Sequence, residues 1–245
     1  MDDTKSPRWR VKLEGDDLDV GHLLKRFTAP ELRVVRTEGE GASWLESSTF
    51  DGYEDQVKVR EAAIQLVERI NGAARLKWRR HRNVIVGSEL EKLTDEGVQR
   101  HTIVAVDTIE VRARVMPVTV VVGDEVPAPA EPGSLDTDRW LELAGRDSDV
   151  DEALLLWGSK PNDWVNLYKV YEIVRRRADI VRSGWATRTQ VDRFTRTAND
   201  PVGGGADARH ARSRAQPSPN PMSREEGTDL IGRILERWLD SLIPP

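Results

Sequence analysis

The polar residues best suited to acid–base chemistry lie in one loop before the C-terminal amphipathic segment. Asp207, Arg209 and His210 follow the glycines at 203–205, and Asn199 lies at the other end of the loop. A histidine there could act as a general acid or base, and an arginine could hold an anion. The four residues are therefore candidates for phosphodiester cleavage or anion binding. In the structural alternative, Asp207 caps a turn while Arg209 and His210 bond to backbone carbonyls or water.

The position of this loop before a final amphipathic helix resembles the HEPN superfamily of bacterial defence and toxin proteins, many of which are ribonucleases. The resemblance covers about residues 138–245. It implies a helical ribonuclease in which His210 is the acid–base residue, Arg209 stabilises the phosphate, and Asn199 or Asp207 orients the ribose. The arginine of the family's usual signature would fall on Gly205 in this chain. The resemblance is therefore equally consistent with a non-catalytic binding protein.

A second candidate is the basic segment Arg75–Arg82, which contains five basic side chains, one histidine and one tryptophan in eight residues. Such a composition can bind phosphates and stack a base. The nucleic-acid-binding residues predicted on this basis are Arg75, Lys77, Trp78, Arg79, Arg80 and Arg82. In the alternative interpretation, the segment is a solvated connection that pairs with Glu89, Glu91 and Asp95.

A third candidate is an aromatic helix face. Trp164, Tyr168, Tyr171 and Arg175 follow the i, i+4, i+7, i+11 spacing that places side chains on one side of a helix. Because aromatic residues and arginine dominate binding hot spots, this face is predicted to bind a protein partner or a second copy of the chain. Alternatively, the aromatic rings pack beneath the C-terminal helix around Trp238.

Composition narrows the other possibilities. The chain of 245 residues contains no cysteine, which excludes disulfides and thiolate metal sites, and its four histidines lack metal-ligand spacing. The glycines at 203–205 lack the Lys-Ser/Thr of a nucleotide-binding P-loop, so no cofactor is predicted. The formal charge of −5 means that any nucleic-acid contact must be local. The polar start and the lack of a membrane-spanning apolar run favour a cytoplasmic protein with no membrane partner.

The elements that position these candidates form two predicted parts. Residues 1–122 are expected to be an α+β domain with a mostly antiparallel sheet, backed by two helices on one face. The predicted helices are a short one that includes Leu18–Phe27 and a longer one over Glu54–Asn71, with Gly72 as its C-cap. The predicted strands are Trp9–Leu13, Leu32–Thr37, Ala42–Ser48, Asn83–Leu90, Gln99–Asp107 and Ile109–Val122.

After a Pro/Gly-rich linker at 123–137, residues 138–245 are expected to form a helical domain with a long loop at 201–221. Its last helix should begin at a capping box formed by Ser223 and Glu226. Helices are also predicted at Asp138–Ala144, Asp151–Trp157, Pro161–Arg177 and Thr189–Thr197.

Together these features predict a cytoplasmic, non-enzymatic interaction protein that binds a protein partner, or itself, through the aromatic helical surface. The two alternatives are a HEPN-like ribonuclease that uses His210 and Arg209, and a nucleic-acid-binding module that uses Arg75–Arg82.

Overall fold

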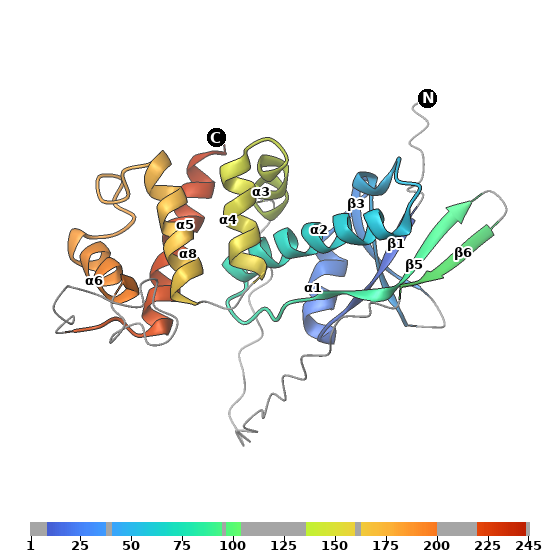
Figure 1. Cartoon of the computed structure of the whole chain (residues 1–245), viewed down its shortest axis with the longest axis horizontal. Helices are drawn as coiled ribbons and strands as arrows, with labels where there is room; N and C mark the ends of the chain where they lie inside the picture. Colours follow the sequence, from blue (N-terminus) through green and yellow to red (C-terminus); the bar gives the residue numbers. More distant parts are fainter. Residues whose placement is uncertain are drawn as a thin grey trace, which may run out of the picture.

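The computed structural model describes residues 9–37, 41–94, 97–103, 136–159, 163–199 and 220–243. It shows an N-terminal antiparallel sheet with helices, followed by a helical region (Figure 1). The predicted α+β fold is confirmed. The predicted strand Ile109–Val122, most of the linker 123–137 and most of the loop 201–221 lie outside the described residues.

The elements follow the predicted order along the chain. None of the described helices has the length and apolar character needed to cross a lipid bilayer. The elements are β1 (Trp9–Glu14), α1 (Asp17–Arg26), β2 (Thr28–Ala29), β3 (Leu32–Arg36), β4 (Ser43–Ser47), a short 3-10 helix (Ser48–Phe50), α2 (Gln56–Lys77), β5 (Ile85–Thr94), β6 (Gly97–Thr102), α3 (Asp136–Ala144), α4 (Ser148–Ser159), α5 (Trp164–Arg177), α6 (Arg188–Asn199) and α8 (Arg224–Ser241).

The sheet has six strands in the order β2-β3-β4-β1-β5-β6, and every neighbouring pair is antiparallel. Val11 in the central strand β1 lies opposite Leu45 and Leu90, so the apolar residues of three strands share one face. This face forms a buried cluster with residues of α1 and α2, among them Leu23 and Val67. Both helices therefore cover the same side of the sheet, as the sequence predicts.

The opposite face of the sheet carries a row of alternating charges. Arg33, Glu46, Arg10, Glu91 and Arg100 lie opposite one another across five strands. The two carboxylates are buried, at 3% and 1% exposure. Glu46 pairs with Arg33, and Glu91 pairs with Arg10 and Arg100. Pairing compensates for the loss of water around these buried charges.

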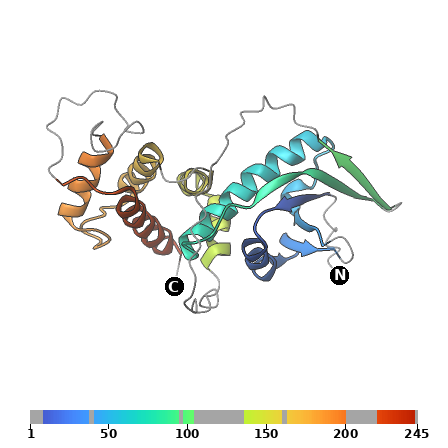
Figure 2. The same ribbon diagram turned by 90° about the horizontal axis from the view of Figure 1, so that it is seen from below.

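Helix α2 is longer than predicted and joins the two parts of the molecule (Figures 1 and 2). Its first half packs on the sheet, whereas Ala73 and Leu76 belong to the core of the helical part. The predicted end at Gly72 was wrong. Gly72 lies inside the helix, which continues to Lys77. The glycine does not end the helix; it allows the close approach of α4 at the point where the two helices cross.

The crossing of α2 and α4 brings the two backbones into direct contact. A Cβ atom at Gly158 would overlap the carbonyl oxygen of Glu68 and lie 2.8 Å from the amide nitrogen of Gly72. A Cβ atom at Gly72 would likewise overlap the carbonyl oxygen of Leu154. The Arg75 side chain reinforces the contact by donating to the Trp157 carbonyl at 2.7 Å. Only glycine at both positions permits this approach.

The helical part is built around α5 and α8. The predicted capping box is confirmed, because the Ser223 hydroxyl accepts from the Glu226 amide at 3.1 Å and the Glu226 carboxylate accepts from the Ser223 amide at 2.7 Å. Trp238 is 1% exposed within the core that α8 shares with its neighbours. Gly227 makes room for the Trp164 ring, which lies 2.7 Å from the position its Cβ would take. Trp164, the first residue of α5, therefore packs against α8.

The glycine crossing predicts a large effect for one methyl group. We expect Gly158→Ala to lower the free energy of unfolding by about 3 kcal/mol or more, because the two helix backbones must separate. Urea unfolding followed by circular dichroism measures this loss. The matched control is Gly21→Ala in α1, where no heavy atom lies within 4 Å of the new Cβ. This control should change stability by at most about 1 kcal/mol, in the stabilising direction. Equal stability of G158A and wild type would contradict the crossing.

Candidate anion-binding site

The aromatic residues predicted to form a partner surface belong to the protein's own core. Trp164, Tyr168 and Tyr171 are 2%, 8% and 4% exposed. Their rings surround Phe194 of α6, with ring centroids 5.6 to 6.2 Å from that of Phe194. The prediction of an exposed aromatic face is therefore corrected. Packing against α6 and α8 gains more from these large rings than exposure to water would.

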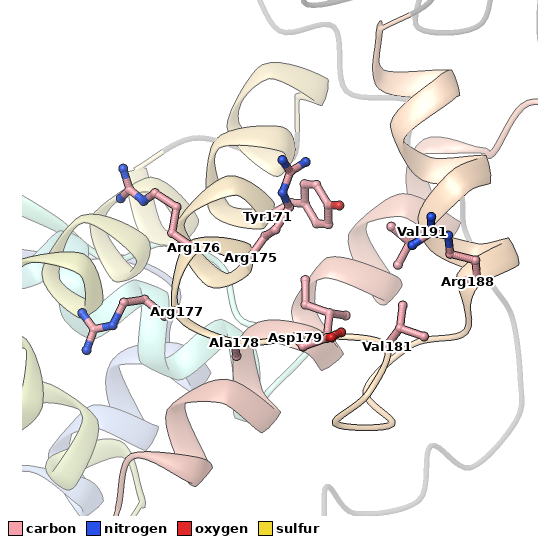
Figure 3. A pocket seen from close by; sticks show the side chains of 10 residues that line it. Tyr171, Arg175, Arg176, Arg177, Ala178, Asp179, Val181, Arg188 and Val191 are labelled. Carbon is pink, nitrogen blue, oxygen red and sulfur yellow. The ribbon is translucent and has the colours of Figure 1, made fainter.

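Two of the four residues predicted on that helix nevertheless border a pocket. Tyr171 and Arg175 lie at its edge, at the C-terminal end of α5, and the pocket has a volume of about 530 Å³. The connection between α5 and α6 supplies Ile180 and Val181, and the start of α6 supplies Arg188 and Val191. Figure 3 shows Arg188 on the opposite side of this space from Arg175 and Tyr171. The same connection supplies Asp179, so the pocket combines an apolar wall with cationic side chains and one carboxylate.

The neighbouring arginines of α5 are neutralised by acidic residues at the start of α4. Arg176 pairs with Asp149 at 2.9 Å, and Arg177 pairs with both Asp147 and Asp149 at 2.8 Å. The hydrogen bonds from Arg177 lower the pKa of Asp147, and they raise the pKa of Arg177. Figure 3 shows both side chains directed away from Tyr171. They contribute backbone and side-chain stems to the pocket wall, with their charges already compensated.

Arg175 and Arg188 differ from these paired arginines. In the part of the chain that the structure describes, Arg175 has no ion-pair partner, and its guanidinium lies 6.0 Å from the centre of the Tyr171 ring. Arg188 is 80% exposed at its side chain, and its one ion-pair contact within the described ranges is Asp192, at 3.6 Å. Two guanidinium groups on opposite sides of one pocket are thus available to an anion.

The hydroxyl group of Tyr171 completes the site. The residue is 4% exposed, yet its oxygen points into the space between α5 and Arg188 (Figure 3). No hydrogen bond joins this hydroxyl to another residue of the described ranges. The ring is held by Phe194 and Tyr168, so the hydroxyl position is fixed. A phenol in this position can donate a hydrogen bond to an anion held by the arginines.

The basic segment Arg75–Arg82 is engaged within the protein. Arg75 donates to the Trp157 carbonyl, and burial lowers its pKa. Lys77 pairs with Glu236 at 2.9 Å and lies over the Trp140 ring. Trp78 stacks on His22 of α1, with ring centroids 5.2 Å apart. The first half of the segment is therefore occupied in packing α2 against its neighbours.

The second half of the segment is also paired, with one exception. Arg79 pairs with Asp229 and Arg82 with Asp16, both at 3.2 Å, whereas Arg80 is exposed. The segment pairs with the protein itself, as in the structural alternative, but its first residues belong to α2 and are partly buried, so it is not simply a solvated connection. The expected partners Glu89 and Glu91 were wrong, and Asp95 lies outside the described residues. Those carboxylates pair across the sheet with Lys12, Arg10 and Arg100. The register of the strands places Glu89 and Glu91 beside basic residues of the neighbouring strands, and these residues form the ion pairs in place of Arg75–Arg82.

His81 in the same segment forms a buried polar cluster. Its Nε2 lies 3.0 Å from Oδ1 of Asn71, and its Nδ1 lies 3.1 Å from Oδ1 of Asp19. Burial lowers the pKa of His81, and the Asp19 carboxylate opposes this effect. The Asn71 amide also bonds to both backbone groups of Val84, donating to the oxygen at 2.8 Å and accepting from the nitrogen at 3.0 Å. The cluster fixes the path of the chain from α2 into β5.

The residues of the nuclease hypothesis are only partly described. His210, Arg209 and Asp207 lie outside the described ranges, so that hypothesis stays a prediction. Asn199 is the last residue of α6, and its side-chain nitrogen donates to the Thr195 carbonyl at 2.8 Å. Within the described ranges, no group of three His, Asp or Glu side chains is arranged to hold a metal ion.

Sequence reasoning missed Arg188, Phe194 and the apolar wall of the pocket. A local signal was present, since residues 163–199 contain eight basic and four acidic side chains in a chain that is acidic overall. The start of α6 was also readable, because Thr187 and Gln190 form a reciprocal cap. Neither signal shows that Arg188 lies across from Arg175.

No protein-family model, curated protein or solved structure matches this chain. The pocket therefore has to be interpreted from its own geometry and chemistry.

The role of the segment after α2 can be tested at Asn71. We expect Asn71→Ala to lower the free energy of unfolding by about 2 to 4 kcal/mol, because both backbone groups of Val84 would be buried without partners. Arg80→Ala, at the exposed position of the same segment, should change it by less than about 0.5 kcal/mol. Urea unfolding of both variants measures the difference. Equal effects of the two substitutions would show that the cluster of Asn71, His81 and Asp19 does not fix the path of the chain from α2 into β5.

Proposed function

We propose that this protein is a non-enzymatic interaction protein that binds an anionic group of a protein partner in the pocket formed by Tyr171, Arg175 and Arg188. The observation that supports this proposal is the pairing pattern of the arginines. Arg176 and Arg177 have acidic partners at the start of α4. Arg175 has none among the described residues, and Arg188 has only the 3.6 Å contact with Asp192, so both can turn to an anion in the pocket that they line.

Arginine is well suited to such a role. Its planar guanidinium donates in a fixed fork that matches a carboxylate or phosphate, and it is weakly hydrated for a cation. The rim of the pocket also offers Val181, a hydrophobic residue that is 36% exposed. An anchoring charge beside an apolar contact is typical of a protein interface.

Local charge also favours an anionic partner. The region 163–199 carries twice as many basic as acidic residues, although the whole chain has a formal charge of −5. Interactions of exposed charges decay within about 10 Å at moderate salt, so the local excess determines what approaches the pocket. A partner with an acidic segment is attracted at this place and repelled elsewhere. The proposed partner surface is therefore the arginine-bearing end of α5, and not its aromatic face, which is buried.

The test measures binding of a fluorescein-labelled oligoglutamate peptide by anisotropy. We expect saturable binding to the wild type, and at least about tenfold weaker binding to the double variant Arg175→Gln, Arg188→Gln. Both side chains lie at the surface, so the variant should keep the wild-type thermal unfolding midpoint.

The matched control is Arg182→Gln, which removes the same charge from the same connection but from a side chain outside the pocket lining. Its affinity should stay within about twofold of wild type, since exposed charge pairs contribute little. Equal losses in R182Q and in the double variant would reduce the interaction to general charge attraction and contradict the proposal. So would the absence of peptide binding to wild type.

A further inference from the structure

We infer that the pocket is selective for a phosphorylated side chain of the partner over a carboxylate. This inference rests on the proposed function and names the group that the site recognises. It is carried by the convergence of three donors on one space: the Arg175 and Arg188 guanidinium groups and the Tyr171 hydroxyl.

The charge of the two arginines favours a phosphate over a carboxylate. The lining of the pocket contains the guanidinium groups of Arg175 and Arg188 and one carboxylate, Asp179, which accepts a hydrogen bond from the Arg182 amide at 3.0 Å. A second carboxylate, Asp192, lies 3.6 Å from Arg188. A carboxylate ligand brings one negative charge, which a single guanidinium group can pair. A phosphomonoester carries about −1.5 to −2 at neutral pH and offers three strong acceptor oxygens. It therefore matches two cations placed on opposite sides of one ligand.

The number and direction of the hydrogen-bond donors also favour a phosphate over a carboxylate. Tyr171 is buried apart from its hydroxyl end, and Phe194 holds its ring at a centroid distance of 5.6 Å. Its hydroxyl points between the arginines and has no partner within the described ranges. A carboxylate that is bound bidentately by one arginine has its two oxygens occupied. The third oxygen of a phosphate gives the fixed phenol an acceptor of its own.

The open rim of the pocket favours a phosphate group that is carried on a larger molecule. Pockets for free small molecules usually enclose about 70–90% of the ligand surface. Here Arg188 is 80% exposed and Val181 is 36% exposed at the rim. Such a site holds the tip of a side chain, while the apolar residues Val181 and Val191 contact the residues beside it. A phosphoserine or phosphothreonine in an apolar peptide context meets these requirements.

The experiment compares three fluorescein-labelled peptides of one sequence with wild-type protein by anisotropy. The central residue is phosphoserine, glutamate or serine, and the flanking residues are valine and leucine. We expect the phosphoserine peptide to bind at least about tenfold more tightly than the glutamate peptide, which corresponds to one additional charged hydrogen bond. Inorganic phosphate should displace the phosphoserine peptide.

The decisive variant is Tyr171→Phe, which keeps the packed ring and removes only the hydroxyl. It should weaken the phosphoserine peptide by about tenfold and leave the glutamate peptide within about twofold. The thermal unfolding midpoint of Y171F should equal that of wild type, since the hydroxyl makes no hydrogen bond to another described residue. Equal loss for both peptides, or no loss for either, would overturn the assignment of the phenol.

The outcomes separate this inference from the proposed function. If the glutamate and phosphoserine peptides bind equally and both depend on Arg175 and Arg188, the proposed function stands and the phosphate selectivity is wrong. If neither peptide binds, both fail. A single-stranded RNA oligonucleotide that binds as tightly as the phosphoserine peptide, and is weakened by the same variants, would also overturn the inference, because its backbone consists of phosphodiesters.

Discussion

The close crossing of α2 and α4 is the constraint on which the rest of the structure depends. Gly72 and Gly158 allow two helix backbones to touch, which makes α2 a member of both hydrophobic cores. This contact sets the position of α4, whose first residues and preceding turn carry Asp147 and Asp149. These carboxylates bind Arg176 and Arg177 at the end of α5. A backbone contact between two glycines thus determines which arginines are neutralised.

The arrangement of charge gives the pocket its character. Most of the basic side chains in the sheet and in the segment Arg75–Arg82 are paired with carboxylates, either across the sheet or between helix ends. An exposed, unpaired arginine costs little, because water solvates it, and by itself it indicates nothing. The pocket is distinguished by the fixed phenol of Tyr171 between the exposed side chains of Arg175 and Arg188. Tyr171 is held in place by the core around Phe194, so packing inside the helical part orients a donor on its surface.

The basic segment after α2 illustrates how local composition can mislead. Arg75–Arg82 has the residue types of a nucleic-acid-binding strand, but its side chains connect α2 to α1, α4 and α8. Each of these contacts joins residues far apart in the sequence. The same chemistry that would hold a phosphate instead holds the protein's own carboxylates and carbonyls. At the pocket, by contrast, Arg175 has no ion-pair partner among the described residues, and Arg188 has a contact of 3.6 Å with Asp192 in its own helix.

The sequence by itself determined the α+β class, the hairpin of β3 and β4, the helices on one face of the sheet, and the capping box of α8. These features follow from hydrophobic period, turn residues and caps, which act over a few residues. Tertiary structure decided three other matters: that Gly72 serves a helix crossing, that the aromatic residues of α5 are internal, and that Arg188 lies across a pocket from Arg175 and Tyr171. Local patterns could not reveal them, because each depends on which distant backbone or charge arrives at the same place.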